Sequence, residues 1–183
     1  MKRIKLNKNQ FPPQALYLIA ASRIGLGWIF LWSFLDKLWG LGFATCRDSA
    51  TDIVNQGCAS AWINGGSPTS GFLQYGTSGP LAENFAALAG STWADWLFMM
   101  GLLLIGLALI LGIGVRVATI SASLLLALMY LAALPPPNNP FLDDHLIYIL
   151  MLALIAVTNG SQRFGFGPWW QKQPLVKRYS ILR

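Results

Sequence analysis

The stretch from Trp93 to Leu134 decides the fold. It reads WADWLFMMGLLLIGLALILGIGVRVATISASLLLALMYLAAL, with Asp95 and Arg116 as its charged residues. Each half, about 93–113 and 115–134, has the roughly 20 apolar residues that a helix needs to cross a membrane. Glycines separate the halves, and glycine readily adopts the backbone conformations of a tight turn. The stretch therefore predicts two antiparallel membrane-spanning helices.

Two further apolar runs flank this hairpin. They cover about 15–35 and 142–157, and the second is nearer 16 residues than 20, so a re-entrant segment is its alternative. The 183 residues are 55% hydrophobic and 11% charged, which lies outside the composition of soluble globular domains. We predict an all-α integral membrane protein, a single domain over residues 1–183, built as a four-transmembrane-helix bundle.

The charges are distributed unevenly between the two sides of this bundle. Bases precede the first run, lie between the second and third, and follow the fourth: Lys2, Arg3, Lys5, Lys8, Arg116, Arg163, Lys172, Lys177, Arg178 and Arg183. Six of the seven acids lie in the other two connections or at the adjoining ends of the runs: Asp48, Asp52, Glu83, Asp95, Asp143 and Asp144. Since Lys and Arg near span ends stay on the cytoplasmic side, both termini are expected to be cytoplasmic.

The formal charge of +6 raises the question of a nucleic-acid partner. The bases lie in short tails beside the spans, without interleaved aromatic residues. Anionic headgroups of membrane lipids explain such tails better. We therefore expect membrane lipids as partners and no nucleic acid.

A long outer connection, about residues 40–92, carries both cysteines. A loop of this length is more than a connection, and we expect it to cap the bundle. Cys46 and Cys58 would face an oxidising compartment, where paired thiols usually form a structural disulfide. The alternative is a redox-active pair that exchanges electrons with a quinone or a thiol, although the wide spacing lacks the CxxC arrangement that activates a thiol.

Polar or charged side chains lie within two of the apolar runs, the first and the third. In the first run Arg23, Gly27, Phe30, Phe34 and Lys37 recur at intervals of four and three and share a face. Arg23 lies roughly 12 Å inside the span, where it would snorkel, pair with a buried group or polarise a quinone carbonyl. The third run has a mildly polar stripe that ends at Tyr130, and the second has a small-residue face of Gly101, Ile105, Ala108 and Gly112.

The fourth run opens with a group of ionisable residues. Asp144, His145 and Tyr148 fall within about one helical turn. His145 is the only histidine and a natural proton carrier near neutral pH, so an acid–imidazole–phenol cluster suits the proton uptake of quinone reduction. The alternative is an aspartate N-cap, which we favour for Asp143, followed by interfacial side chains. No metal site or nucleotide-binding loop is expected, because the chain lacks a Cys/His/acid constellation and a Gly-rich phosphate motif.

Four blocks together resemble the DoxX/DoxD family. They are Arg23–Phe30 running to Lys37, Ile105–Gly112 followed by Arg116, Asn139–His145, and Arg163–Trp170. The resemblance departs at Met99–Gly101, where many relatives carry a glutamate. It implies a four-helix bundle of the prokaryotic inner membrane, similar to the DoxD-type membrane subunit of thiosulfate:quinone oxidoreductase, commonly with a small DoxA-like subunit.

The expected function follows from this resemblance: quinone-linked oxidation of a small sulfur anion, thiosulfate to tetrathionate. Lys37 and Arg47 would attract the anion, and His145, Asp144 and Tyr148 would handle protons. Arg23 and Tyr130 are candidates for contact with the quinone, which acts as a diffusible electron acceptor. The alternatives are a non-catalytic membrane subunit of a larger respiratory complex and a thiol–disulfide exchanger that uses Cys46 and Cys58.

Overall fold

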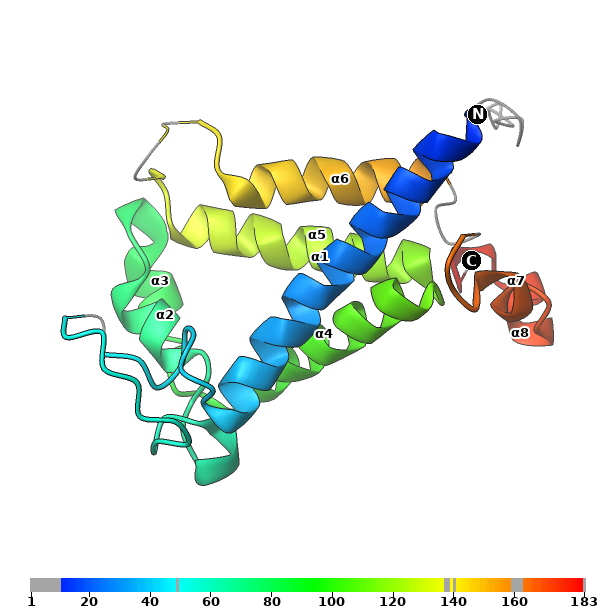
Figure 1. The fold of residues 1–183 in the computed structure, drawn as a ribbon. Coiled ribbons are helices and arrows are strands. Elements are labelled where there is room, and N and C mark those ends of the chain that lie inside the picture. The colour runs from blue at the N-terminus through cyan, green and yellow to red at the C-terminus, as the bar shows by residue number, and fades with distance from the viewer. Residues whose placement is uncertain (1–10, 49, 137–138, 140, 159–162, 183) are drawn as a thin grey trace.

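Four long apolar helices form the body of the protein (Figure 1). The computed structural model describes residues 11–48, 50–136, 139, 141–158 and 163–182. The long helices are α1 (Pro13–Trp39), α4 (Thr92–Leu111), α5 (Val115–Ala132) and α6 (Asp144–Thr158). They match the four apolar runs, and the described residues between them form short helices and loops with one isolated bridge, between Arg47 and Val54.

Three of these helices are long and apolar enough to cross a membrane. They are α1, with 27 residues, α4 with 20 and α5 with 18. Helix α6 has 15 residues and, at 1.5 Å per residue, rises only about 22 Å. The expectation of an all-helical chain with helices long and apolar enough to cross a membrane is confirmed, whereas a fourth complete crossing and cytoplasmic termini stay predictions.

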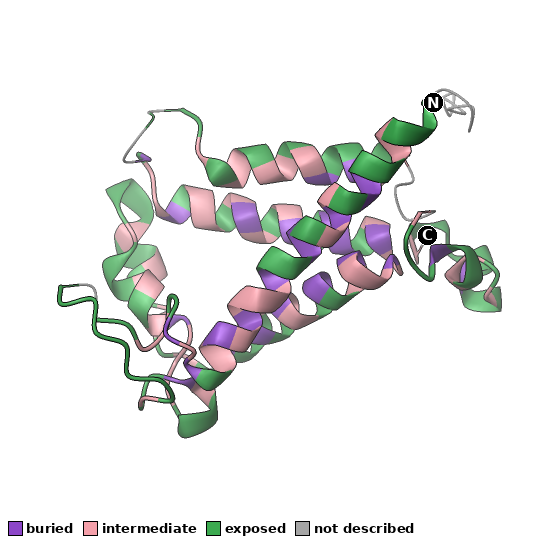
Figure 2. Cartoon of the chain, in the orientation of Figure 1, coloured by how far each residue is buried: buried purple, intermediate pink, exposed green. Residues whose placement is uncertain are grey.

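Helices α1 and α4 cross closely at two glycines. A Cβ atom on Gly27 would lie 2.9 Å from the backbone nitrogen of Ile110, and one on Gly106 would lie 2.8 Å from that of Leu31. Each helix thus presents a glycine to a bulky residue of the other, as close packing between membrane helices requires. Buried residues gather where the two helices cross (Figure 2).

The small-residue face predicted on the second run is wrong in one respect. A Cβ atom on Gly101 would meet no other atom within 4 Å, so Gly101 does not mark the close approach. Gly106 does. Because α4 is apolar on every side, its composition does not show which face packs against α1.

Four of the five residues on the predicted face of α1 are buried, and the fifth, Lys37, is half-buried. Arg23, Gly27, Phe30 and Phe34 are all buried. Exposed neighbours such as Trp28 and Ile29 lie on the remaining surface of the helix, where a lipid-facing side chain belongs.

The turn between α4 and α5 is a tight hairpin, as predicted. Gly112 and Gly114 have φ angles of +71° and +57°, which side-chain-bearing residues rarely adopt. Helix α5 packs against both α4 and α6. Helix α6 in turn contacts α1, and this contact closes the bundle.

A cap covers one end of the bundle (Figure 1). It contains η1 (Trp62–Asn64), α2 (Ser70–Tyr75), η2 (Gly79–Leu81) and α3 (Ala82–Ala86). The predicted disulfide between Cys46 and Cys58 is present. The cap is fixed to the bundle by an edge-to-face contact of Trp62 with Trp96 and by a hydrogen bond from the backbone nitrogen of Ser78 to the Ala132 carbonyl.

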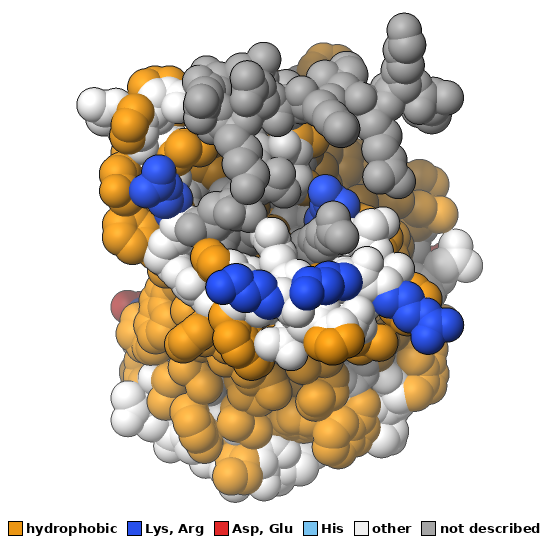
Figure 3. Space-filling model, turned by 90° about the vertical axis from the view of Figure 1, so that its right-hand side faces the viewer, with side chains coloured by type: hydrophobic (Ala, Val, Ile, Leu, Met, Phe, Trp, Pro, Cys, Tyr) orange, Lys and Arg blue, Asp and Glu red, His pale blue; other side chains and the backbone are white. Residues whose placement is uncertain are grey.

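The C-terminal segment lies at the other end, as does the start of α1 (Figure 1). It comprises α7 (Gly167–Trp170), α8 (Pro174–Arg178) and η4 (Ser180–Leu182). Val176 is completely buried and the Trp170 indole nitrogen donates to the Leu182 carbonyl at 2.6 Å, so the segment is folded upon itself. Basic side chains form a row across this end of the molecule (Figure 3). The N-terminal bases Lys2–Lys8 and Arg183 lie outside the described residues.

Candidate functional site

Arg23 is the most deeply buried charged residue of the bundle. Its side chain is wholly inaccessible to solvent. The guanidinium donates to the carbonyl oxygens of Leu109 and Ile110 at the end of α4, and to those of Arg163 and Phe164 after α6. We call this arrangement of five residues the Arg23 clamp.

The clamp pairs the buried Arg23 guanidinium with carbonyl groups at the end of α4 that lack a partner within the helix. The last carbonyl groups of a helix have no partner within the helix and carry partial negative charge, so a guanidinium at the C-terminal end of α4 is favourably placed. Gly165 lies directly against this site, because a Cβ atom there would be 2.6 Å from the Leu111 carbonyl oxygen and 3.3 Å from an Arg23 nitrogen. The backbone nitrogen of Phe166 donates to the same carbonyl at 2.8 Å.

A second layer holds the clamp from outside. The Arg163 guanidinium lies 5.1 Å from the centre of the Tyr17 ring, and the Tyr17 and Phe164 rings are 5.3 Å apart. Of the Arg23 side-chain nitrogens, only Nε is buried without a hydrogen-bond partner among the described residues. Because the other two nitrogens of the guanidinium bond to backbone carbonyl groups, the geometry favours structural pairing of Arg23, one of the predicted alternatives, over contact with a quinone.

Asp36 organises the start of the cap. It is 2% exposed, and its carboxylate accepts hydrogen bonds from the backbone nitrogens of Phe43, Ala44 and Thr45 at 2.9–3.1 Å. The neighbouring Lys37 is partly buried and makes no hydrogen bond within the described part of the chain. Asp36 is thus structural, while the ammonium group of Lys37 stays available for an anion.

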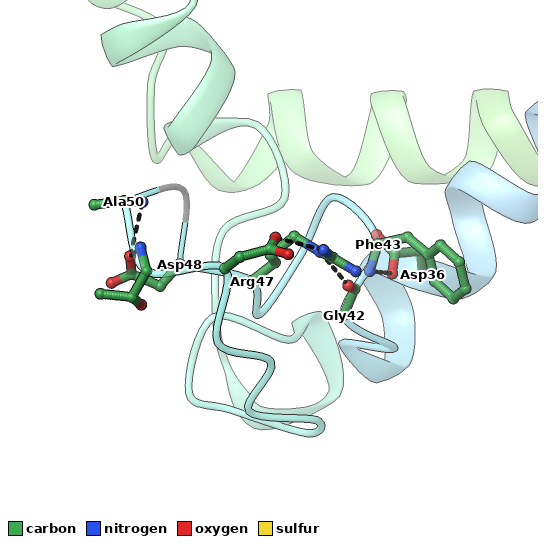
Figure 4. A network of polar contacts seen from close by, with 8 residues as sticks. Asp36, Gly42, Phe43, Arg47, Asp48 and Ala50 are labelled. Carbon is green, nitrogen blue, oxygen red and sulfur yellow. Dashed lines mark hydrogen bonds and ion pairs between the residues drawn. The ribbon is translucent and has the colours of Figure 1, made fainter.

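Arg47 is already paired with an acid. Its Nε donates to the Gly42 carbonyl at 2.8 Å, and its Nη1 lies 2.6 Å from the Asp52 carboxylate (Figure 4). This exposed ion pair reduces the positive charge that Arg47 would offer to an anion.

Asp48 closes the neighbouring turn of the cap. Its carboxylate accepts hydrogen bonds from the backbone nitrogens of Thr51 and Ala50 at 2.8 and 2.9 Å. These bonds, that of Thr51 first, hold the pKa of Asp48 below its usual value because they stabilise the ionised form.

At the start of α6, His145 pairs with Asp143. The imidazole Nδ1 lies 2.6 Å from the Asp143 Oδ2, and the Asp143 Oδ1 accepts the backbone nitrogen of Leu146 at 3.3 Å. Asp143 is therefore the N-cap that was favoured for it. It is also the carboxylate neighbour of His145, in place of Asp144. This contact orients the imidazole ring.

No hydrogen bond or ion pair joins Asp144 or Tyr148 to this pair within the described residues. Asp144 is exposed and makes no hydrogen bond within the described residues. Tyr148 packs against the hydrophobic core. The Tyr130 hydroxyl donates to the Phe141 carbonyl at 2.9 Å, so it fixes the chain that leads into α6. The described part of the chain contains no group of three His, Cys, Asp or Glu side chains that could hold a metal ion.

Asp95 is a buried carboxylate that we did not single out from the sequence. It is 7% exposed, and its Oδ1 accepts hydrogen bonds from the Ser67 hydroxyl and from both the hydroxyl and the backbone nitrogen of Thr69. An acid within an otherwise apolar run was the available signal, together with the polar Ser67–Thr69 segment in the cap. The contact fixes the cap to the first turn of α4.

The predicted site residues thus divide between the two ends of the bundle. Lys37, Arg47 and the Asp143–His145 pair belong to the end covered by the cap, whereas Arg23 lies beside the end of α4 at the opposite side. Arg23 and Lys37 are about 21 Å apart along α1. A single small ligand therefore cannot contact both Arg23 and Lys37.

Comparisons with known proteins do not define a class for this chain. No model of a protein family matches it, and neither the curated proteins nor the solved structures show a significant match.

Proposed function

We propose that the chain is a membrane subunit of a quinone-linked oxidoreductase that oxidises a small sulfur anion, thiosulfate to tetrathionate. In this proposal the bundle crosses a prokaryotic inner membrane four times, with both termini cytoplasmic and the cap outside. The observation that carries the proposal is the Asp143–His145 pair at the capped end, together with the four sequence blocks that resemble the DoxX/DoxD family.

The reaction requires both electrons and protons to balance. Two thiosulfate ions lose two electrons as an S–S bond forms between them, and a quinone gains these two electrons and two protons to become a quinol. His145 suits the proton step, because Asp143 orients its ring and the Nε2 atom makes no hydrogen bond within the described residues.

The proposed roles of the remaining residues follow from their positions. Lys37 attracts the anion beneath the cap, and Arg47 contributes less because Asp52 neutralises it. Tyr148 and Tyr130 lie on α6 and α5 at the same end as His145 and would flank a quinone ring. Arg23 is left out of ligand binding, since its hydrogen bonds go to backbone carbonyl groups.

An anaerobic assay of quinone reduction tests the proposal. Purified protein, alone and together with a co-expressed small subunit, is mixed with thiosulfate and a soluble quinone, and quinol formation is followed by absorbance. We expect thiosulfate-dependent reduction that falls at least tenfold in His145→Gln and is unchanged in Tyr75→Phe, which alters an exposed tyrosine of the cap. Absence of turnover in both preparations would contradict the proposal.

A second candidate is a non-catalytic subunit of a larger respiratory complex. It is favoured by the way the buried charges of the bundle are used: Arg23 bonds to backbone carbonyl groups, and Asp36 and Asp95 bind loop segments of the cap. Buried polar groups that are bonded within the chain itself serve architecture as readily as chemistry. Co-purification with a large oxidoreductase, without turnover by the chain, would support this candidate.

A further inference from the structure

A groove lies between α5, α6 and the C-terminal segment, away from the capped end. Its volume is about 640 Å³. Ile120, Ala156, Val157 and Ile181 form apolar walls, and Arg116, Thr119 and Ser180 add polar groups. Its walls are therefore suited to hydrocarbon, with a cation at one side.

Arg116 is only partly engaged with the protein. One of its guanidinium nitrogens donates to the Ser180 carbonyl at 3.0 Å. A guanidinium carries five N–H groups, and no other hydrogen bond of this side chain is formed within the described residues. Arg116 is also half-buried in the first turn of α5, where apolar surroundings strengthen an interaction with an anion.

The surroundings of the groove are basic. Lys172, Lys177 and Arg178 are exposed on the C-terminal segment and belong to the end that bears the row of basic side chains (Figure 3). The described residues contain two acid–base pairs, Arg47–Asp52 and His145–Asp143, and both lie at the capped end. The bases beside the groove are thus not neutralised by a carboxylate in the described part of the chain.

The C-terminal segment also presents large apolar side chains to its surroundings. Phe166, Trp169, Leu175 and Ile181 are each more than half exposed. A short structured segment with aromatic and basic side chains, placed at the ends of apolar helices, has the composition of an element that lies in a membrane interface.

We propose that this groove binds an anionic phospholipid of the leaflet next to the C-terminal segment. The phosphate contacts the free N–H groups of Arg116, and an acyl chain lies along Ile120 and Val157. The exposed bases of the C-terminal segment hold the surrounding anionic headgroups. Charge complementarity selects anionic over zwitterionic lipid, because each basic side chain near the surface strengthens the attraction roughly fivefold.

Native mass spectrometry of the full-length protein in mild detergent tests this site. The protein is incubated with equal amounts of phosphatidylglycerol and phosphatidylcholine, and the bound lipids are counted. We expect phosphatidylglycerol to be retained at least fivefold better, and Arg116→Gln to remove most of that preference. Arg47→Gln, an arginine change at the other end, is the matched control and should leave the preference intact.

A second variant separates loss of the site from loss of the fold. Ala156→Leu fills the groove without changing a charge and should reduce retention of both lipids, while the circular dichroism spectrum stays that of the wild type. Equal retention of the two lipids by the wild type, or an unchanged preference in Arg116→Gln, would overturn the proposal. Displacement of the lipid by 10 mM inorganic phosphate would also overturn it, since it would show a site for the free anion. The readout does not involve quinone reduction, so it is independent of the proposed function.

Discussion

Arg23 and Phe164 are 141 positions apart in the sequence, yet an Arg23 guanidinium nitrogen donates to the Phe164 carbonyl at 2.7 Å. The same side chain reaches the end of α4. One residue of the first helix thus binds the end of the second long helix and the chain that follows the last one. This contact explains how a buried cation is tolerated in α1 without a carboxylate partner among the described residues.

Replacement of Arg23 should therefore destabilise the whole bundle. Arg23→Leu removes hydrogen bonds to four carbonyl groups, and we expect the free energy of unfolding to fall by about 3 kcal/mol or more, because hydrogen bonds from a charged donor are among the strongest. Arg23→Lys should recover part of this loss. Thermal unfolding in detergent, followed by circular dichroism, measures both.

Arg47→Gln serves as the control for this series. It removes an exposed ion pair, which should change stability by no more than about 1 kcal/mol. If Arg23→Leu unfolded at the wild-type temperature but had lost quinone reduction, the clamp would not be structural, and Arg23 would belong to the ligand site after all.

Alanine substitutions at two pairs of glycines in α1 and α4 distinguish positions of close helix packing from open positions. Gly27→Ala and Gly106→Ala place a methyl group within 3 Å of the opposing helix and should each cost about 1–3 kcal/mol. Gly25→Ala and Gly101→Ala meet no neighbouring atom and should raise stability by up to about 1 kcal/mol through helix propensity. Unfolding temperatures in one detergent compare all four variants. If the first pair of variants were as stable as the second pair, the close crossing of α1 and α4 would be refuted.

Loss of Asp95 should release part of the cap. Asp95→Ala leaves the hydroxyl groups of Ser67 and Thr69 without their acceptor, at a cost of about 1–3 kcal/mol. Limited proteolysis should then cleave the cap several times faster than in the wild type. Glu83→Ala, an exposed acid within the cap, should leave the cleavage rate unchanged.

Removal of the disulfide distinguishes a structural role of the two cysteines from a redox role. Cys46 and Cys58 are 12 positions apart, and opening a loop of this size by replacing both with Ser should cost about 3 kcal/mol. We expect faster proteolysis of residues 46–58 with quinone reduction preserved at low temperature. A stable cap with abolished activity would instead support thiol–disulfide exchange.

The turn at Asp48 should respond to acid. Because hydrogen bonds from Thr51 and Ala50 lower the pKa of the folded-state carboxyl, ionised Asp48 stabilises the turn. This contribution is complete above the unfolded-state pKa of about 3.9 and is lost as the pH falls through the lower folded-state value. An NMR titration of the Thr51 amide should therefore show its transition below pH 4. Asp48→Asn should remove that transition, and a midpoint above 4 would contradict the hydrogen-bonded geometry.

The long helices were predictable because lipid imposes simple requirements on length and composition. Pro13 marks the start of α1, and two glycines with positive φ mark the hairpin between α4 and α5, so these boundaries follow from local chemistry. The buried face of α1 followed from the spacing of Arg23 and its neighbours. The disulfide of Cys46 and Cys58 followed from the placement of both residues in one outer loop that was expected to face an oxidising compartment.

The partners of the polar residues were harder to predict, since they depend on three-dimensional contacts. Nothing near Arg23 in the sequence points to the carbonyl groups of residues 163–164, because backbone acceptors have no sequence signature. Whether Asp143 or Asp144 is the neighbour of His145 depends on the residue at which α6 begins. A shift of that start by one residue would exchange the positions of the two aspartates. Gly106 was missed because α4 is apolar on all sides.

The sequence positions of the clamp residues mean that the clamp can form only late in synthesis. The carbonyl partners of Arg23 are made 86 and 140 residues after it, which at usual translation rates is a delay of several seconds to about half a minute. Throughout that interval α1 carries a guanidinium that only water, headgroups or the insertion machinery can solvate. The nascent first helix thus remains unfinished until the ribosome has translated almost the entire chain.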